Sequence, residues 1–136
     1  MKIYNSLSGC KQVFKPITQK KINMYVCGMT VYDDCHIGHA RTFLTFDLFL
    51  RFFNFLGFEV NYVRNITDIE DKIIEKAKIE KVNYDDISSR FIESMHEDFK
   101  KLNLLSPNSV SYTHLRAHET DSYLVCRLLL EKKKKN

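Results

Sequence analysis

Two histidines and a cysteine stand in one short segment whose residue types could do chemistry. Residues 24–41 read MYVCGMTVYDDCHIGHAR, where Cys27 closes a short apolar run and His36, Gly38 and His39 open a long one. A strand, a tight turn and a helix start can receive a phosphate chain, because the first helical turn carries free backbone N–H groups and a partial positive charge. The imidazoles can add hydrogen bonds to phosphoryl oxygens, and Gly38, which has no Cβ, lets a planar base approach the backbone. The segment therefore indicates a nucleotide site.

The segments around these residues predict a strand, a helix and a second strand. Residues 22–27 form a short apolar run with polar flanks, as in a strand of a parallel sheet. Residues 37–56 are apolar nearly all round, so we expect a helix that packs on more than one side, with Asp33 or Asp34 available to cap its start. Residues 58–64 predict the second strand. Strand, helix and strand of this length form a right-handed βαβ unit.

The flanking segments predict a small hairpin before this unit and two helices after it. Residues 2–5 and 11–14 suit two short strands around the turn Ser8-Gly9. Local signals predict the other boundaries: Gly57 ends the long helix, Thr67 or Asp68 caps the next, and Asn83 or Asp85 begins the last. Asp47 and Arg51, four residues apart, can pair on the wetter side of the long helix. The predicted fold class is α/β, with parallel strands and an N-terminal β-hairpin.

Composition is that of an ordinary globular domain. The chain has 136 residues, of which 44% are hydrophobic, and a net charge of +4; this length allows one domain with a core. The most apolar stretch, residues 43–58, is broken by Asp47, Arg51 and Asn54, which argues against a membrane span. Residues 1–21 lack the continuous apolar run of a signal peptide. The four cysteines show no disulfide spacing, so we expect a cytoplasmic protein.

The last part of the chain differs in character from the rest. Residues 110–120 resemble one translated frame of a transposase-type sequencing adapter, and residues 124–131 resemble the flow-cell primer that follows it. We therefore expect residues 109–136 to be a non-native tail, and the protein sequence proper to cover residues 1–108. The alternative is a native amphipathic segment with a solvated lysine end.

Residues 1–108 resemble the N-terminal part of a cysteinyl-tRNA synthetase, a class I aminoacyl-tRNA synthetase. The resemblance runs through Tyr25-Val26-Cys27-Gly28, Thr30-Val31-Tyr32-Asp33, Cys35-His36-Ile37-Gly38-His39-Ala40-Arg41-Thr42, Gly57-Phe58, Tyr62-Val63-Arg64-Asn65-Ile66-Thr67-Asp68 and Asp71-Lys72-Ile73-Ile74. A lone HIGH string is weak evidence, but a strand-end cysteine before it and the RNITD run after it make the match specific. The resemblance implies the first half of a Rossmann-like nucleotide-binding catalytic domain, with a small N-terminal hairpin.

The resemblance implies an ATP site around the two histidines. In the family, cysteine attacks the α-phosphate of ATP, bound with magnesium, to give cysteinyl-adenylate and pyrophosphate. His36 and His39 are then the catalytic donors to the phosphoryl oxygens, Gly38 lies under the adenine, and Thr30 belongs to the same ATP site. The alternative for His36 is an imidazole that caps the helix or bonds solvent, and for His39 a surface histidine.

The resemblance also implies a substrate-cysteine site at Cys27, Gly28 and Thr67. The family cysteine at position 27 is one of four ligands of a zinc ion that binds the substrate thiolate, and a soft thiolate–metal bond separates cysteine from serine. The other three ligands lie beyond residue 108, so Cys27 alone cannot hold the ion. For Cys27 the alternative is a small buried hydrophobe at a strand end. For Thr67 it is a helix N-cap.

The implied partners are ATP, L-cysteine and, for the full-length enzyme, tRNA(Cys), with no membrane and a monomeric full-length protein. This chain lacks the second lysine-rich signature and the tRNA-binding end of the family, so we expect it to be inactive alone and, with open strand edges, aggregation-prone. Two alternatives remain. A ligase that passes cysteine from the same adenylate to an amino sugar shares these motifs, and a non-catalytic nucleotide-binding module would carry a genuine basic tail.

Overall fold

A hairpin precedes a parallel sheet that is covered by helices. The computed structural model describes residues 1–113. The elements in chain order are β1 (Lys2–Asn5), β2 (Cys10–Val13), β3 (Lys21–Val26), α1 (Ile37–Phe55), β4 (Glu59–Thr67), α2 (Asp71–Glu80), α3 (Tyr84–Lys101) and β5 (Ser109–Thr113). β1 and β2 pair antiparallel, and the second sheet has the order β3-β4-β5 with parallel pairing. The predicted α/β class, parallel strands and N-terminal hairpin are confirmed.

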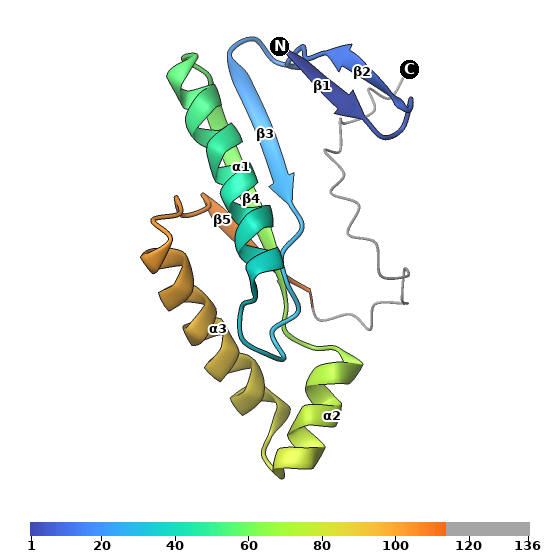
Figure 1. Ribbon diagram of the computed structural model, residues 1–136, viewed down its shortest axis with the longest axis vertical. Helices are drawn as coiled ribbons and strands as arrows, with labels where there is room; N and C mark the ends of the chain where they lie inside the picture. Colours follow the sequence, from blue (N-terminus) through green and yellow to red (C-terminus); the bar gives the residue numbers. More distant parts are fainter. Residues whose placement is uncertain (114–136) are drawn as a thin grey trace.

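The βαβ unit brings the start of α1 to the carboxyl end of β3. β3 and β4 pair in register from Lys21 with Glu59 to Val26 with Arg64. α1 lies along these two strands, with its first turn near the arrowhead of β3, and α2 lies beyond the same end of the sheet (Figure 1). Open α/β sheets bind ligands at the carboxyl ends of their strands. The fold therefore places the residues from the first motif at the edge where a ligand is expected.

Two hydrophobic clusters hold these elements together. The smaller one joins Met24 and Val26 of β3 to Leu50 of α1 and Tyr62 of β4. The larger one gathers the loop after β3, the start of α1, the end of β4 and the inner faces of α2 and α3; its buried members are Met29, Val31, Phe43, Ile66, Ile73, Ala77, Ile87, Phe91, Met95 and Phe99. Because this larger cluster lies under the carboxyl end of the sheet, α2 and α3 fix the position of the loop that carries the histidines.

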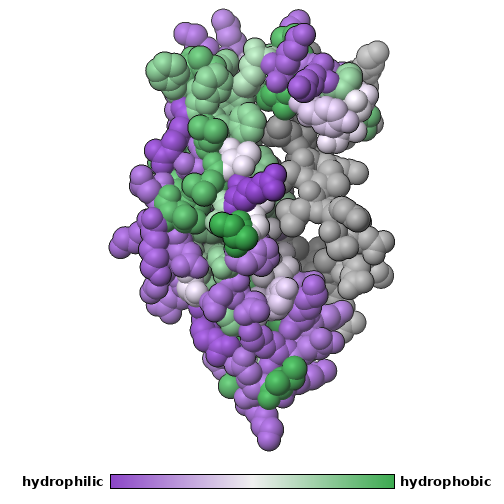
Figure 2. Space-filling view, viewed as in Figure 1, coloured by the Kyte–Doolittle hydropathy of each residue, from purple (hydrophilic) through white to green (hydrophobic). Residues whose placement is uncertain are grey.

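Within residues 1–113, helix α1 packs against the sheet through Leu50 and against α3 through Phe43, but one apolar face is left exposed, so it is not covered nearly all round. Its buried residues are Phe43, Leu50 and Phe53. Four large apolar side chains on another face are exposed, Leu44, Leu48, Phe52 and Phe55, which we call the outer stripe. Apolar side chains gather over the upper part of the molecule in Figure 2, where α1 runs. No helix among these residues is long and apolar enough to cross a membrane.

The predicted caps of α1 and α2 are wrong. The side chains predicted for α1 bond residues of other helices, and Thr67, predicted for α2, belongs to the preceding strand. His36, not Asp33 or Asp34, caps α1, since Lys76 of α2 donates to Asp33 and Ser94 of α3 donates to Asp34. Helix α2 begins after Glu70, whose side chain makes no capping bond, because β4 continues through Thr67. The remaining boundary predictions hold: Asn83 caps α3, and Gly57, with φ 79°, follows the end of α1.

The predicted Asp47–Arg51 pair is confirmed, and both side chains also bond backbone groups of the segment after α3. Arg51 Nε donates to Asp47 Oδ2 at 2.6 Å, while Asp47 Oδ1 accepts the backbone N–H of Leu105 and Arg51 donates to the carbonyl of Asn103. Both side chains therefore tie α1 to the segment that leaves α3. This segment leads into β5, and Asn108 bonds both backbone groups of Tyr62 in β4.

Residues 109–113, the first of the adapter-like tail, form β5. Their backbone pairs with β4 from Val63 with Ser109 to Thr67 with Thr113. The ladder bonds join backbone groups, and the side chain of Val110 also packs against the larger hydrophobic cluster. The rest of the predicted tail, from residue 114, lies outside the described residues.

Candidate functional site

The first turn of α1 is closed by the two histidines themselves. His36 Nδ1 accepts the backbone N–H of Gly38 at 3.0 Å, and the backbone N–H of His36 points to His39 Nδ1 at 3.4 Å. The two rings stack with centroids 3.9 Å apart. This is a capping box in which imidazoles replace the usual hydroxyl and carboxylate. The alternative role weighed for His36, helix capping, is thus present in the structure, and its catalytic role stays a prediction.

The capping bonds determine which ring nitrogen carries the proton. An Nδ1 atom that accepts a hydrogen bond has no proton of its own, and a neutral imidazole then carries its proton on Nε2. Because both Nδ1 atoms accept backbone N–H groups, both rings present an Nε2–H donor. Two donors from one helix turn are what a developing negative charge on a phosphoryl group requires.

Burial favours the neutral form of His39. The pKa of His39 is lowered from its ordinary value, first by burial of the ring and second by the neighbouring His36. A neutral His39 retains the Nδ1 lone pair that accepts the N–H of His36. The capping geometry and the lowered pKa therefore agree on the same protonation state.

Gly38 is the residue that allows the His36 ring to fold over the helix start. A Cβ at position 38 would lie 2.7 Å from His36 Cε1 and 2.9 Å from His36 Nδ1, which is closer than real Cβ atoms approach. The expectation that first-turn N–H groups are free is therefore wrong for Gly38, whose N–H is already bonded to His36. A phosphate at this turn meets the imidazole edges rather than that backbone N–H.

The end of β3 carries the residues predicted to bind cysteine. Cys27 is an exposed free thiol just past the last ladder residue, so it is not the buried small hydrophobe weighed as its alternative. Gly28 lies against β4, where its N–H donates to Asn65 Oδ1 at 2.6 Å and a Cβ would lie 1.5 Å from the carbonyl oxygen of Asn65. No side chain fits between the strands at position 28.

Thr30 and Thr67 lie side by side at the same edge. They form an isolated parallel bridge, in which Thr67 donates to the carbonyl of Met29 and accepts the N–H of Val31. Thr67 belongs to β4 and caps no helix, which removes the alternative weighed for it. The structure thus brings together two groups: Cys27, Gly28, Thr30 and Thr67 at the strand ends, and His36, Gly38 and His39 at the helix start that follows by a short loop.

Two buried polar residues of β4 behind this edge were not predicted as functional. Arg64 is 3% exposed, and its guanidinium lies over the rings of Phe43 in α1 and Phe99 in α3, 5.5 Å and 4.6 Å from their centroids. Burial lowers its pKa, and its Nε has no hydrogen-bond partner among residues 1–113. Asn65 is 7% exposed and bonds Gly28. A charged and an amide residue inside an apolar strand are the sequence signals that point to them.

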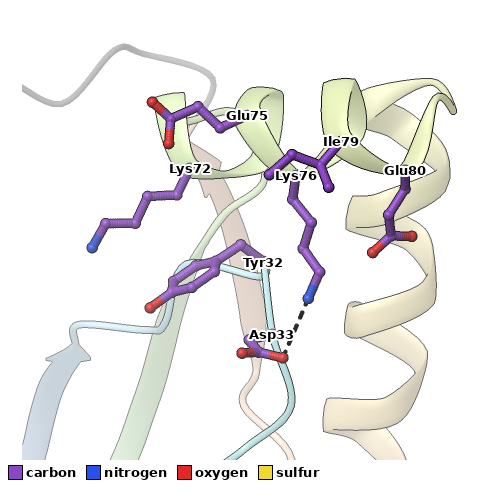
Figure 3. A pocket seen from close by; sticks show the side chains of 7 residues that line it. All are labelled: Tyr32, Asp33, Lys72, Glu75, Lys76, Ile79 and Glu80. Atoms are coloured by element: carbon purple, nitrogen blue, oxygen red, sulfur yellow. Dashed lines mark hydrogen bonds and ion pairs between the residues drawn. The ribbon is translucent and has the colours of Figure 1, made fainter.

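A separate open pocket of about 370 Å³ lies between the loop after β3 and α2 (Figure 3). Lys76 bonds Asp33 across it at 3.3 Å, and Lys72 Nζ lies 5.3 Å from the centre of the Tyr32 ring. Its lining is Tyr32, Asp33, Lys72, Glu75, Lys76, Ile79 and Glu80. None of the predicted site residues lines it, so the pocket is a neighbour of the site and not the site itself.

Comparison with known proteins places the chain in a family. The profile described as tRNA synthetases class I (C) catalytic domain matches residues 13–125. The chain therefore belongs to the class I tRNA synthetases of this (C) family.

The relatives carry one name. A cysteine–tRNA ligase of Francisella philomiragia is 59% identical over 107 residues, which is 79% of this chain and 23% of the relative. A cysteine–tRNA ligase of Shewanella denitrificans is 54% identical over 108 residues, 79% of this chain and 24% of the relative. The chain thus resembles the N-terminal portion of a cysteinyl-tRNA synthetase and spans under a quarter of the length of these relatives.

Proposed function

We propose that this chain is the N-terminal part of the catalytic domain of a cysteine–tRNA ligase. The parent enzyme joins cysteine to ATP as cysteinyl-adenylate and then passes the cysteinyl group to tRNA(Cys). The observation that carries the proposal is the double-histidine cap of α1, whose first turn lies near the end of β3 that leads into Cys27 (Figure 1). The names of the relatives support tRNA, rather than an amino sugar, as the acceptor.

In the first step, a carboxylate oxygen of cysteine attacks the α-phosphorus of ATP, and the bond to pyrophosphate breaks. Negative charge grows on the phosphoryl oxygens in the transition state. His36 and His39 donate from Nε2 to these oxygens, and neither needs to transfer a proton. Gly38 and Thr30 line the ATP site, and magnesium accompanies the triphosphate. In the second step, a ribose hydroxyl of tRNA attacks the cysteinyl carbonyl and AMP leaves.

Cys27 fits one position of a zinc site for the substrate thiol. Its thiol is exposed at the strand end, and thiolates suit zinc. Among residues 1–113, no three His, Cys, Asp or Glu side chains converge to hold a metal ion. By the family resemblance, the remaining ligands come from the part of the parent protein beyond residue 108. When bound, zinc supplies a soft site that distinguishes the thiolate of cysteine from the hydroxyl of serine. Gly28 and Thr67 border the same substrate.

The 136-residue chain is inactive alone under this proposal, because it holds half of the ATP site and one zinc ligand. The native part ends near residue 108 under this proposal, and residues 109–136 are adapter-derived; the 107- and 108-residue alignments with the relatives support this boundary, whereas the family profile extends to residue 125. The nucleotides that encode residues 110–135 test this boundary, since a native tail would differ from adapter sequence at synonymous positions. The full-length parent is a cytoplasmic monomer.

Pyrophosphate exchange tests the activity directly. In a chimera, residues 1–108 replace the matching 107-residue region of the Francisella philomiragia ligase. We expect cysteine-dependent exchange from the chimera and none from the 136-residue chain. His36→Ala and His39→Ala in the chimera should each lower kcat by about 10²-fold, the usual loss for one transition-state donor. If the chimera catalyses cysteine-dependent exchange and neither histidine substitution lowers it, the proposed roles of the histidines are refuted. Exchange by the 136-residue chain would refute its predicted inactivity.

A further inference from the structure

The pairing of β3 with β4 contains one extra residue next to Cys27. Val26 pairs with Arg64, and the next paired residues are Thr30 and Thr67. Three residues, 27 to 29, on the β3 side therefore face two, 65 and 66, on the β4 side. One unmatched residue between two parallel strands is a β-bulge, a feature that re-aims side chains beside functional sites.

A bulge leaves a backbone group without its ladder partner, and a side chain replaces that partner here. The N–H of Gly28 donates to Asn65 Oδ1 at 2.6 Å instead of to a carbonyl of β4. Asn65 is 7% exposed and its bond to Gly28 is partly buried, so water competes for this bond less than for an exposed one. Most buried polar side chains have at least one hydrogen-bond partner, and this bond supplies one for Asn65.

Gly28 and Asn65 are also in close steric contact through their backbones. A Cβ at Gly28 would lie 1.5 Å from the carbonyl oxygen of Asn65 and 2.6 Å from its carbonyl carbon. The backbone of Gly28 therefore packs directly against the backbone of Asn65. The side-chain oxygen of Asn65 also accepts the N–H of Gly28, so Asn65 contacts Gly28 in two ways. Cys27 immediately precedes Gly28, so the contacts of Asn65 with Gly28 restrict the backbone conformation on the C-terminal side of Cys27.

We infer that Asn65 is a positioning residue for the Cys27 thiol: by bonding the N–H of Gly28 it holds the bulge that aims the thiol at the substrate cysteine. The inference rests on the proposed function of Cys27. It assigns Asn65 to the cysteine half of the site and not to the ATP half, because its bond is to Gly28, next to Cys27, and the two histidine donors lie at the start of α1. Loss of this bond therefore affects the use of cysteine more than the use of ATP.

The hydrogen bond is tested first in the complete 136-residue chain by amide exchange. Asn65→Leu keeps the approximate size of the side chain but removes the acceptor, whereas Asn65→Asp keeps an oxygen at the same position. We expect the Gly28 amide to exchange about five- to tenfold faster in Asn65→Leu, the range for one hydrogen bond, and to stay near the original rate in Asn65→Asp. The β3 amides that pair with β4 report whether the fold is intact. An unchanged Gly28 rate in Asn65→Leu overturns the inference.

The matched control is Asn61, the other asparagine of β4 whose side chain reaches β3. Asn61 Nδ2 donates to Asn23 Oδ1 at 3.3 Å on the exposed face. Asn61→Leu removes a cross-strand amide contact of the same type, far from the bulge. It should leave the exchange rate of Gly28 within about twofold, the change expected for an exposed pair. An equal effect of both substitutions would mean that Asn65 only stabilises the sheet, which overturns the inference.

Kinetics in the chimera test the consequence for the substrate. Asn65→Leu should raise KM for cysteine by about tenfold or more, as for a misplaced group, and leave KM for ATP within about twofold. Equal effects on the two KM values, or none, overturn the positioning role. Cys27→Ser separates this test from the proposed function. If Cys27→Ser still activates cysteine and rejects serine, the role of Cys27 fails, while faster Gly28 exchange in Asn65→Leu would still establish the bond itself.

Discussion

The rings of His36 and His39 stack with their centroids 3.9 Å apart, and each Nδ1 accepts a backbone N–H of the turn that both residues form. Helix caps are usually made by small hydroxyl, amide or carboxylate side chains. Here the groups that close the helix are also the proposed donors to the phosphoryl oxygens. Because capping uses Nδ1 and catalysis would use Nε2, one imidazole can do both at the same time.

Gly38→Ala should separate the two roles of this turn. The new Cβ would lie 2.7 Å from His36 Cε1, and the imidazole, at the free end of a side chain, must swing away. Loss of the cap costs about 1 kcal/mol, but alanine favours the helix over glycine by about the same amount. We therefore expect a small change in the free energy of unfolding, measured with urea, and a fall of about 10²-fold in kcat of the chimera in pyrophosphate exchange.

Gly57→Ala is the matched control for that substitution. Gly57 has φ 79° and no atom within 4 Å of its added Cβ, so the cost is backbone strain alone, about 1 kcal/mol. It should lower stability and leave exchange activity within about twofold, a change of under 1 kcal/mol in the barrier. If Gly38→Ala instead lost stability and kept its activity, the imidazole geometry would have no catalytic role.

The lowered pKa of His39 predicts a pH dependence of stability. Burial and the nearby His36 lower this pKa below 6.5, so the unfolded chain binds more protons than the folded chain between the folded pKa and 6.5. The free energy of unfolding then rises with pH across this window. The contribution of His39 is fully present above pH 6.5 and is lost as the pH falls through the folded pKa, where protonation of Nδ1 also breaks the bond to the His36 N–H.

Two measurements check this dependence in the 136-residue chain. An NMR titration of the His39 ring should give a pKa below 6.5. Urea unfolding between pH 5 and 7.5, a window about this reference value, should show a shallower pH slope in His39→Gln than in the unchanged chain. An unchanged slope in His39→Gln, or a pKa above the ordinary value, would contradict the burial and the capping bond together.

The outline of the fold, the Asn83 cap of α3 and the glycine that ends α1 could be predicted from local sequence, but the caps at the starts of α1 and α2 could not. The apolar run into Cys27, the long apolar helix and the glycine after it are local signals, and the structure follows them. The caps depend on distant partners: Asp34 is held by Ser94, 60 residues away, and Asp33 by Lys76. Hydrogen bonds over such separations leave no periodic trace in a single sequence.

Within the candidate site, the sequence could predict which residues belong to the site, but not the neighbouring atoms that require glycine at positions 28 and 38. The resemblance points to Gly28 and Gly38, but the neighbours that exclude a side chain there, the backbone of Asn65 and the ring of His36, follow only from the folded arrangement. The extra residue between β3 and β4 is likewise a property of pairing. The outer stripe of α1 was expected to be covered, because an all-round apolar helix gives no sign of which neighbours are present.

Arg64→Lys should destabilise the chain although it conserves the charge. The planar guanidinium of Arg64 lies over Phe43 and Phe99 and so joins α1 to α3. An ammonium is more strongly hydrated and cannot stack in this way. With the side chain almost fully buried, we expect a loss of about 2 kcal/mol in the free energy of unfolding, measured by urea denaturation.

Arg90→Lys provides the exposed counterpart. Arg90 lies over Phe91 at 4.7 Å and pairs with Glu80, but about half of its side chain is exposed. Solvent screens this site, so the loss should stay within about 0.5 kcal/mol. Equal losses in the two variants would show that burial between the two helices is not what makes Arg64 important.

The outer stripe of α1 predicts that the 136-residue chain self-associates. Leu48 is 67% exposed and Phe55 is 84% exposed, and removal of such side chains from water is worth about 1.5–3 kcal/mol each. The double substitution Leu48→Lys and Phe55→Lys should therefore shift the chain toward monomer in light scattering coupled to gel filtration. Ile79→Lys is the control, because Ile79 is 80% exposed on α2, away from the stripe, and should leave the distribution unchanged. If the double variant and the control associate as strongly as the original chain, the open edge of β3, at one end of the sheet order β3-β4-β5, becomes the better explanation.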